Sequence, residues 1–308
     1  GDEDFFHTAA WARVLKHSYG YEPVHFVCRE RAALTFDMPL MTVSSVLTGR
    51  RGVSLPFTDR CAPFFRGQEL LSEAVEAAKQ YGKTRGWRYV EWRDSSYIRE
   101  GQAPSESFLI HDLIFDGSLS VLFKNFDEGN RRNIRKAERE NVSVEISRSS
   151  GALEAFYRLH CLTRKRHGIP PQPLSFFRNI FAHVIDKGSG VTVLARHAGK
   201  DIAAALFFHF GRTAVYKFGA SDPLQWPLRP NNLVMWNAIQ WFGERAFSRL
   251  TLGRTETDNP GLRQFKRAWN AGESPLRYFR FDLKRNAPVP ARHEVTGLSK
   301  TLFTKMPA

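Results

Sequence analysis

The residues best suited to chemistry gather between Asp222 and Lys266. Arg229 directly precedes a strong helical run, and a helix N-terminus favours an anion through its free N–H groups and its dipole. Arg254 follows a short apolar strand and a glycine, a position that commonly faces a ligand. Asp222 and Glu256 supply carboxylates that could grip or deprotonate an amine. Such groups could serve acyl transfer to an amine, a reaction in which positioned donors hold the oxyanion.

A predicted order of helix, strand, polar turn and helix positions these residues. Residues 230–247 carry apolar side chains around most of a helical circumference, which predicts a buried helix. A strand is expected over 249–252, broken by Gly253-Arg254, with a second helix over 262–269. This order brings the arginine, glutamate and lysine towards one end of a sheet. The same pattern also occurs in any ordinary α/β core.

Two more polar residues flank the first of these helices. Asn231 could cap the helix or bind a ligand, and the sequence leaves both roles open. Tyr216 lies in the strand before the loop that leads into the helix, where a tyrosine can line a site or fill the core.

Several chemistries lack their motifs. The chain has no HExxH, no GxSxG and no Walker loop, and its 10 histidines are scattered, so no metal centre is expected. The three cysteines, Cys28, Cys61 and Cys161, are widely spaced and odd in number, which argues against a disulfide framework or a zinc site. This cysteine usage suits a reducing cytoplasm, and no tightly bound cofactor is expected.

Length and charge define the class of protein and of partner. The 308 residues suffice for two domains, and contents of 42% hydrophobic and 25% charged residues are those of a soluble globular protein. No apolar run is long enough to span a bilayer, and no signal peptide is recognisable. The net charge of +14 predicts an anionic partner, such as nucleic acid, a nucleotide-linked precursor, acyl-CoA or the inner face of a membrane. Alternatively, the basic surface only keeps the protein soluble.

The first part of the chain predicts a β-rich α/β domain with one long helix. We expect helices over 5–19 and 69–84, and strands over 23–30, 32–44, 53–55, 89–93 and 108–115. No glycine-rich phosphate loop precedes the long helix.

A basic helical connector is expected over 119–141. Arg131, Arg135 and Arg139 repeat at four-residue spacing and share a face, which Arg132 and Lys136 flank. This strip could face phosphates or RNA. It could equally be a solvated helix face with local Arg–Glu pairs.

The second part of the chain predicts another α/β domain around the polar stretch. We expect strands over 142–146, 190–197, 201–210, 213–220 and 275–283, and helices over 152–166 and 176–185. The tail over 284–308 contains a weak amphipathic helix, 294–305, that could pack on the first domain or touch a membrane.

The chain also resembles a known family in an ordered set of segments. These are FFHTAAWARVLKHSYGYEP, NRRNIRKAERENVSVE, TAVYKFGASD, LRPNNLVMWNAIQW, LTLGRT and NPGLRQFKRAWNAG. They resemble the FemAB/FemX-like aminoacyltransferases and the related BioF2-like (acetyltransferase-6) acyltransferases. The resemblance implies two tandem GNAT-like α/β domains with mainly antiparallel sheets: residues 1–118, a connector over 119–141, residues 142–284, and a tail over 285–308.

The resemblance also suggests roles for individual residues. Phe265-Lys266 matches the family's Phe-Lys pair, so Lys266 is expected to stabilise the reacting carbonyl or oxyanion. We expect its side chain to be exposed, so that its replacement leaves the fold unchanged. Arg229, Arg254 and Lys266 are expected to line one cleft.

The loop before the helix at 230 departs from the common GNAT pattern. It reads WPLRPNN, without the glycines that let a backbone close on a pyrophosphate. This favours aminoacyl-tRNA as acyl donor over acyl-CoA, although the helical arm that many tRNA-dependent relatives carry is absent. The implied function is acyl or aminoacyl transfer to an amine of a cell-envelope precursor or exopolysaccharide. The alternative is a non-catalytic module that binds RNA or a nucleotide-sugar.

Overall fold

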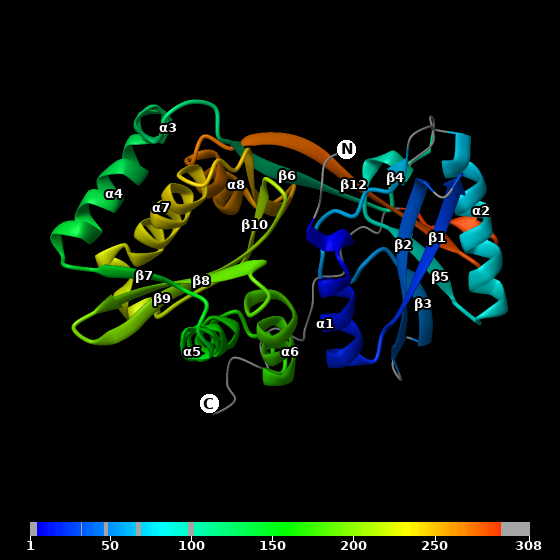
Figure 1. Cartoon of the computed structure of the whole chain (residues 1–308), viewed down its shortest axis with the longest axis horizontal. Helices are drawn as coiled ribbons and strands as arrows, with labels where there is room; N and C mark the ends of the chain where they lie inside the picture. The colour runs from blue at the N-terminus through cyan, green and yellow to red at the C-terminus, as the bar shows by residue number, and fades with distance from the viewer. Residues whose placement is uncertain (1–4, 32, 46–48, 66–68, 98–101, 291–308) are drawn as a thin grey trace. The chain divides into compact units, whose positions relative to one another are not determined.

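The computed structural model describes residues 5–31, 33–45, 49–65, 69–97 and 102–290 (Figure 1). The chain divides into two compact units, each assembled from separate segments. Unit 1 comprises Gly1–Ile110, Arg254–Asp258 and Ser274–Glu294, and unit 2 comprises His111–Gly253, Asn259–Glu273 and Val295–Ala308. Strands β6 (Glu106–Ile114), β11 (Arg249–Glu256) and β12 (Gly272–Asp282) therefore each contribute residues to both units. The predicted tail helix lies outside the described residues.

Unit 1 is a mixed sheet with a long helix on it. Its strands run in the order β1 (Glu22–Glu30), β2 (Ala33–Ser45), β3 (Gly49–Val53), β5 (Tyr89–Trp92) and β12, with α1 (Ala9–Tyr19) and α2 (Glu69–Thr84) as its helices. Neighbouring strands are antiparallel except β3 and β5, which are parallel. The predicted strands over 23–30 and 32–44 and the predicted helices over 5–19 and 69–84 are confirmed, and the two strands pair as a hairpin.

The core of unit 1 forms between α2 and the sheet. The α2 residues Ala74, Val75 and Ala78 belong to one buried cluster with Trp92 and Phe279. The rings of Trp92 and Phe279 stack with centroids 5.6 Å apart. The periodic apolar residues of α2 explain why sequence alone located this helix.

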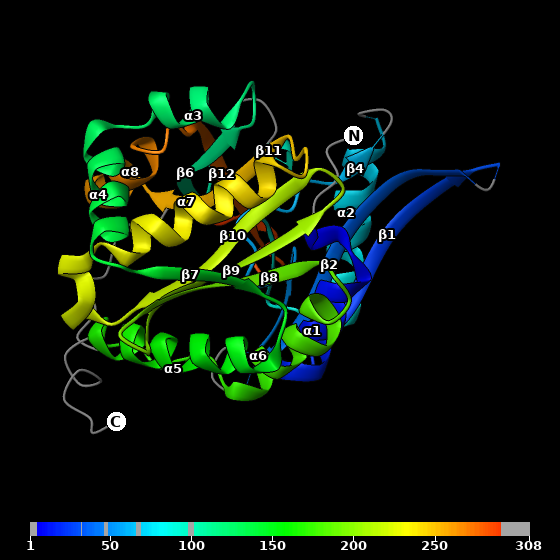
Figure 2. The same ribbon diagram turned by 60° about the vertical axis from the view of Figure 1, so that its left-hand side comes forward.

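Unit 2 is a sheet covered on both faces by helices. Its strands run β7 (Ser143–Ser147), β8 (Gly190–His197), β9 (Lys200–Phe210), β10 (Thr213–Ser221) and β11. The β7–β8–β9–β10 neighbours are antiparallel, whereas β10 and β11 are parallel. Figure 2 shows α5 (Ser150–Arg166) and α6 (Leu174–Ile180) on one face and α7 (Pro230–Gly243) on the other. Helix α4 (Glu128–Arg139) packs on α7.

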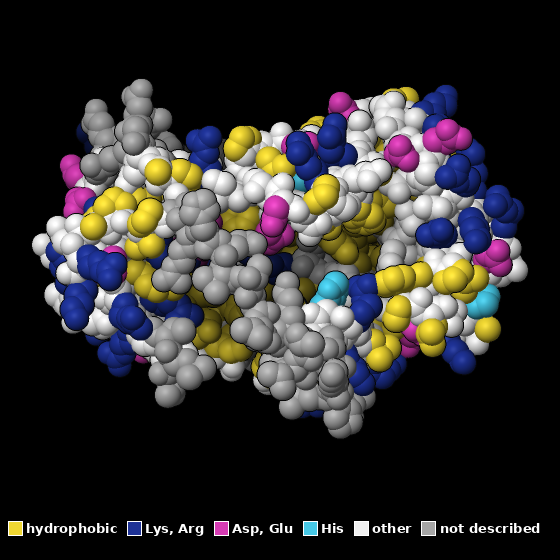
Figure 3. Space-filling model, turned by 180° about the vertical axis from the view of Figure 1, so that it is seen from behind, with side chains coloured by type: hydrophobic (Ala, Val, Ile, Leu, Met, Phe, Trp, Pro, Cys, Tyr) yellow, Lys and Arg dark blue, Asp and Glu magenta, His cyan; other side chains and the backbone are white. Residues whose placement is uncertain are grey.

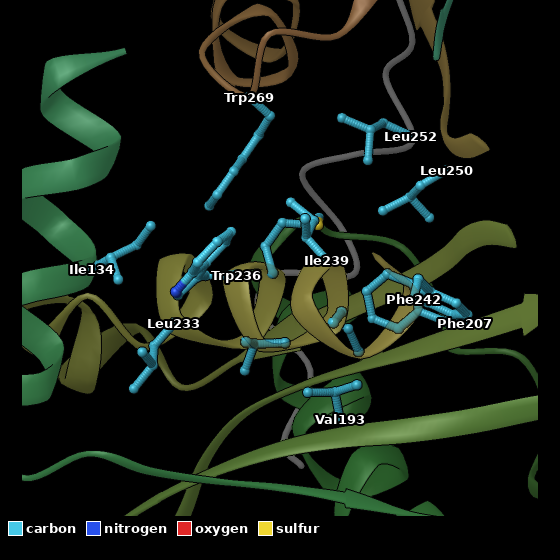
Figure 4. Close-up of a cluster of buried hydrophobic side chains, with 14 of the residues drawn as sticks. Ile134, Val193, Phe207, Leu233, Trp236, Ile239, Phe242, Leu250, Leu252 and Trp269 are labelled. Atoms are coloured by element: carbon cyan, nitrogen blue, oxygen red, sulfur yellow. The ribbon is translucent and has the colours of Figure 1, made fainter. Parts of the chain in front are cut away.

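Helix α7 is the centre of the unit 2 core. Leu233, Trp236, Ile239 and Phe242 are buried, and Figure 4 shows them between the sheet and Trp269, which follows α8 (Pro260–Arg267). The predicted burial of this helix around much of its circumference is confirmed.

The predicted connector and the predicted break at Gly253 are among the elements that differ from the structure. The connector is two helices, α3 (Leu119–Asn125) and α4, because Phe126 is buried and Asp127 caps the second helix by accepting from the Gly129 N–H at 2.7 Å. The expected break at Gly253-Arg254 is wrong: β11 continues to Glu256. Gly253 takes φ +78°, so the strand bends there without ending.

Candidate functional site

Strands β10 and β11 separate soon after they begin, and this creates the local geometry of the site. Both strands are described in full, and they pair at three positions, from Thr213↔Arg249 to Val215↔Thr251. A bulge then interrupts the register of β10 with β9 between Tyr216 and Phe218. Beyond Val215, β10 and β11 no longer pair, and at the end of β10 the main chain of Ser221 is hydrogen-bonded to Thr163 Oγ1 of α5.

Tyr216 lies at this bulge with its ring packed on Phe207, whose centroid is 5.4 Å away. Burial raises the pKa of its hydroxyl to about 12, so the phenol stays protonated and can donate a hydrogen bond. The hydroxyl also lies over Gly219, where a Cβ would come within 1.8 Å of the phenol oxygen. Gly219 therefore leaves the space that Tyr216 occupies.

The loop after β10 is organised by Ser221. Its buried hydroxyl accepts from Trp226 Nε1 at 2.9 Å and from Asn231 Nδ2 at 3.1 Å. Arg166 from α5 lies 4.5 Å from the Trp226 ring centroid. The carboxylate of Asp222 accepts from the Leu224 N–H at 3.0 Å, so it caps the short helix η4 (Pro223–Leu228). Asn231 thus braces the loop rather than capping α7.

The N-terminus of α7 remains a place where an anion could bind. Arg229 is exposed in the left-handed conformation, φ 58°, and its side chain makes no cap hydrogen bond. Asn232 donates to Asn130 Oδ1 at 2.9 Å, which ties this end of α7 to the first turn of α4. Asn130 Nδ2 and Arg131 Nε are buried without a hydrogen-bond partner among the described residues. The side-chain amides of Asn130 and Asn232 therefore meet beside the N-terminus of α7.

Lys266 is buried on α8, which Asn259 caps through the Leu262 N–H at 3.0 Å. The side chain is only 4% exposed, so the expectation of an exposed lysine is wrong. Its Nζ donates to the carbonyl oxygen of Gly253 at 2.9 Å. Gly253 follows Thr251, the last β11 residue paired with β10. The Lys266 ammonium is therefore bound to β11 just past the point where β10 leaves it.

Phe265, the neighbour of Lys266 in the sequence, packs into the core of unit 2. Its half-buried ring meets Trp269 edge-on at 6.3 Å and packs against the core of unit 2. It therefore anchors α8, whatever contact it makes with a substrate.

Two residues that the sequence did not indicate, His111 and Glu273, form a part-buried pair in the same unit as Lys266. His111 is fully buried, and its Nε2 is 3.2 Å from Glu273 Oε2. The Glu273 carboxylate also accepts from Arg263 Nε at 2.6 Å. This hydrogen bond is the main reason why the pKa of Glu273 lies below its usual range. Burial, and next the Lys266 cation, lower the pKa of His111, so the imidazole is neutral at pH 7.

The remaining predicted residues lie elsewhere. Arg254 belongs to unit 1, where Nη1 donates to the Tyr278 hydroxyl at 3.1 Å and the guanidinium lies 4.1 Å from the Phe108 ring centroid. Glu256 is exposed at the end of β11. Arg229 and Lys266 belong to unit 2, so their grouping with Arg254 in one cleft stays a prediction.

Unit 1 contains a cavity that sequence reasoning missed. It encloses about 390 Å³ between the N-terminal helical residues and the β1–β2 hairpin. Its lining combines apolar side chains, among them Phe6 and Leu55, with the basic residues His7, Arg13, Lys16 and His25. His25 Nδ1 is 2.9 Å from Asp37 Oδ1, and this hydrogen bond raises the pKa of His25. The cavity is suited to an anionic group attached to an apolar body.

The predicted basic strip lies on α4. Arg132, Arg135 and Arg139 are exposed, whereas Arg131 and Lys136 are half-buried. Arg135 lies 5.8 Å from the Phe123 ring centroid. Figure 3 shows that Lys and Arg side chains are also spread widely over the face it displays. Among the residues that the structure describes, no cluster of metal ligands occurs, and no helix is long and apolar enough to cross a membrane.

Comparison with known proteins agrees with this geometry. Residues 124–267 match the family model described as "Acetyltransferase (GNAT) domain". The family resemblance is confirmed. The matched segment contains the diverging strands, α7 and Lys266. A comparison with curated protein sequences finds no match.

Solved structures show the same fold over most of the chain. FemX aligns with a TM-score of 0.71 at 15% identity, covering 89% of this chain and 91% of FemX. The C-terminal domain of a putative lysylphosphatidylglycerol synthetase from Agrobacterium fabrum aligns at 0.57, with 12% identity and coverage of 88% and 86%. A tandem GNAT protein from the clavulanic acid pathway aligns at 0.55, with 9% identity and 85% coverage of both chains. The GNAT-like α/β fold is therefore confirmed.

Proposed function

We propose that this protein is an N-acyltransferase that forms an amide on an amine of a cell-envelope precursor or exopolysaccharide. The observation that carries the proposal is the buried ammonium of Lys266, which donates to the Gly253 carbonyl of β11. Gly253 lies just past the last β11 residue that pairs with β10. An extended acyl donor that lies along β10 where β10 and β11 separate would bring its carbonyl to this ammonium. A cation held there stabilises the oxyanion that develops during acyl transfer.

The reaction needs few participating side chains. The acceptor amine attacks the donor carbonyl, the new N–C bond forms, and the oxygen becomes an oxyanion beside Lys266. Collapse then breaks the bond to the ester oxygen or thioester sulfur of the donor, which leaves as alcohol or thiol after taking a proton. The amine gives its proton to a carboxylate, for which Asp222 and Glu256 are the candidates.

We propose aminoacyl-tRNA as the donor, ahead of acyl-CoA. The loop over 223–229 has no glycine, so its backbone is poorly suited to wrap a pyrophosphate. Side-chain donors are present instead: Arg229 at α7 and the exposed arginines of α4. Such cations suit the phosphates near the acceptor end of a tRNA.

We also propose that the unit 1 cavity binds a molecule with an anionic group. His7, Arg13, Lys16 and His25 supply the positive lining, and the apolar lining residues would take a sugar or alkyl portion. The three cysteines are free thiols, which agrees with a reducing compartment such as the cytoplasm.

The decisive test is transfer itself. Radiolabelled aminoacyl-tRNA and acetyl-CoA would each be incubated with an amine-bearing nucleotide-sugar, with and without the protein, and the amide product quantified. Label transferred from tRNA supports the proposal with its preferred donor, and label transferred from acetyl-CoA reverses the donor ranking. Binding of tRNA with no amide from either donor would favour the alternative, a binding module without turnover.

A further inference from the structure

Trp226 is the most exposed tryptophan of the chain, all seven of which the structure describes. It is 37% exposed, whereas Trp241 is half-buried and the other five are at most 9% exposed. It belongs to η4, which is described in full and has no buried residue. An exposed ring alone carries little, because single apolar side chains occur on most protein surfaces. The way this ring is held is more informative.

The Trp226 ring is fixed on two sides. Its Nε1 donates to the Ser221 hydroxyl at 2.9 Å, and the Ser221 N–H donates to Thr163 Oγ1 of α5 at 3.1 Å. The Arg166 guanidinium, also from α5, lies over the ring, 4.5 Å from its centroid. One face is therefore covered and the N–H edge points inward, so the exposed area belongs to the opposite face and the outer edge. A flat surface that is already fixed loses little conformational entropy when a ligand stacks on it.

The surroundings of the ring are basic. The two segments that meet here, residues 162–173 and 221–232, contain one acidic residue, Asp222, whose carboxylate accepts from the Leu224 N–H. They carry four cations: Arg164, Lys165, Arg166 and Arg229. The Arg229 N–H donates to the Trp226 carbonyl at 2.9 Å, so an exposed cation follows the ring within one turn. An aromatic face among cations is the combination that binds nucleotides, through stacking and phosphate contacts.

We propose that Trp226 is a binding residue for the acyl donor, and that a nucleobase of the donor stacks on its exposed face. The proposal rests on the acyl transfer proposed above and identifies a side chain that recognises the donor. Both donors considered there carry a base: tRNA in its unpaired acceptor end and CoA in its adenosine. Along β10, Ser221 lies about 17 Å from Tyr216, which comes just past the last pair with β11. The base is thus bound away from the reacting carbonyl, so its stacking changes the affinity for the donor and not the chemical step.

A lipid surface is the competing partner, because Leu224 of the same loop is 82% exposed. Interfacial binding uses apolar side chains that enter the headgroup region of a membrane. The Trp226 ring is tied by its N–H to Ser221 at the end of β10, so it stays against the protein and presents a face. The observations therefore favour a nucleobase, and vesicle binding becomes an outcome of the test.

The first arm of the test measures binding and needs no acyl transfer. An RNA hairpin that ends in unpaired CCA and CoA would each be titrated by calorimetry, beside base-free counterparts: the same hairpin with abasic nucleotides at its end, and phosphopantetheine. Trp226→Leu should weaken binding of a base-bearing probe by roughly fivefold to a hundredfold, the range for losing one stacking partner, and leave the base-free probes unchanged. A dependence shown by either probe supports the proposal and identifies the source of the base. A dependence shown by neither overturns it.

Trp226→Phe separates stacking from a structural role. Leucine and phenylalanine both lose the Nε1 donor to Ser221, but only phenylalanine keeps an aromatic face. Trp226→Phe should therefore retain most of the affinity that Trp226→Leu loses. Equal losses in the two variants, or weaker binding of the base-free probes, would show that Trp226 only braces the loop.

The second arm measures turnover with the donor that the first arm identifies. Trp226→Leu should raise KM for that donor by a similar factor and leave kcat nearly unchanged. A fall in kcat without a change in KM would contradict a role confined to binding. If no variant forms an amide while base-dependent binding persists, the proposed acyl transfer fails and the binding of a base by Trp226 stands.

The matched control is Trp241→Leu. Trp241 is the half-buried tryptophan near the opposite end of α7, and Arg245 lies 4.2 Å from its ring centroid, so it has the same kind of cation partner. Its replacement should leave the affinity for both nucleotide probes unchanged, and circular dichroism would confirm that all variants fold. Sedimentation with phosphatidylglycerol vesicles tests the competing partner. Vesicle binding that Leu224→Ser abolishes, without any Trp226-dependent affinity for a nucleotide probe, would replace the nucleobase by a lipid surface.

Discussion

Lys266 shows how much a single side chain can depend on its surroundings. A buried ammonium is unfavourable unless acceptors surround it, and the Gly253 carbonyl supplies one of them. Lys266→Met keeps the length and much of the volume of the side chain and removes the charge. If Lys266 holds the oxyanion, kcat should fall by roughly tenfold to a thousandfold, as for loss of one oxyanion donor.

Steady-state kinetics of Lys266→Met would be compared with those of Arg267→Gln. Arg267 is the exposed neighbour of Lys266 on α8. Of the two arginines that pair with Glu273, Arg267 lies farther from the carboxylate than Arg263 does. Arg267→Gln should therefore change kcat by less than Lys266→Met does. Equal effects would mean that turnover responds to the overall charge of α8 and not to the buried ammonium.

His25 predicts a pH dependence for anion binding in the unit 1 cavity. The hydrogen bond to Asp37 raises the pKa of His25, so the folded protein holds the imidazolium to higher pH than a free histidine does. The positive charge is complete below about 6.5, the ordinary histidine pKa, and is lost as pH rises through the raised value. Affinity for an anion should fall across the same interval.

Calorimetric titration of inorganic pyrophosphate between pH 5.5 and 8.5 would measure this dependence. His25→Gln should flatten the curve, whereas His17→Gln, a change at an exposed α1 histidine that does not line the cavity, should preserve it. An unaltered pH dependence in His25→Gln would remove His25 from the binding of the anion.

At the scale of elements, the sequence predicted helices and strands best where the periodic apolar residues of a single element are sufficient to identify it. Helices α2 and α7 were located because their apolar residues repeat along 16 and 14 residues. The local pattern was misleading at Gly253. A glycine there predicted the end of the strand, although β11 continues to Glu256. It also missed the separation of α3 from α4, which depends on burial of Phe126.

The site was predictable only where a motif marked it. Lys266 carries a family signature, whereas His111 sits in an ordinary strand pattern and meets Glu273 across 162 positions of sequence. The unit 1 cavity was missed for the same reason, because α1 and the hairpin each supply part of its lining. Contacts between distant segments leave no local periodicity for sequence analysis to detect.

The bulge in β10 yields a prediction about packing. Gly219→Ala would place a methyl group within 1.8 Å of the Tyr216 hydroxyl oxygen, so the ring must move. Overpacking of this kind typically costs about 1–3 kcal/mol of the free energy of unfolding. We expect a lower Tm and, if Tyr216 contacts the donor, a higher KM for it. Gly151→Ala is the control, because its new methyl group would meet no atom within 4 Å.

Restoring space should reverse the effect if the clash is its cause. Combining Gly219→Ala with Tyr216→Phe removes the hydroxyl oxygen that the new methyl group meets. Thermal denaturation should then show a smaller loss of stability than the two single changes added together. Additive losses would indicate that Gly219 is needed for its backbone and not for the room it gives Tyr216.

At the scale of the whole molecule, the question is whether binding responds to total charge or to its placement. A net charge of +14 attracts any polyanion, so affinity for tRNA alone would not establish a site. The exposed arginines of α4 allow a more specific test. Each phosphate contact contributes somewhat less than one unit to the slope of the logarithm of the binding constant against the logarithm of the salt concentration. Replacing Arg132, Arg135 and Arg139 by Gln should therefore reduce that slope by about two to three units.

The control removes the same charge from other surfaces. Lys187→Gln, Lys284→Gln and Arg285→Gln also lower the net charge by three, at exposed positions outside α4. Binding of aminoacyl-tRNA would be titrated at several salt concentrations for both triple variants. If α4 meets the phosphates, only the first variant loses slope, since the slope counts the phosphate contacts that are lost. Equal slopes for the two variants would show that the strip is a solvated face and that tRNA responds to the general field of the molecule.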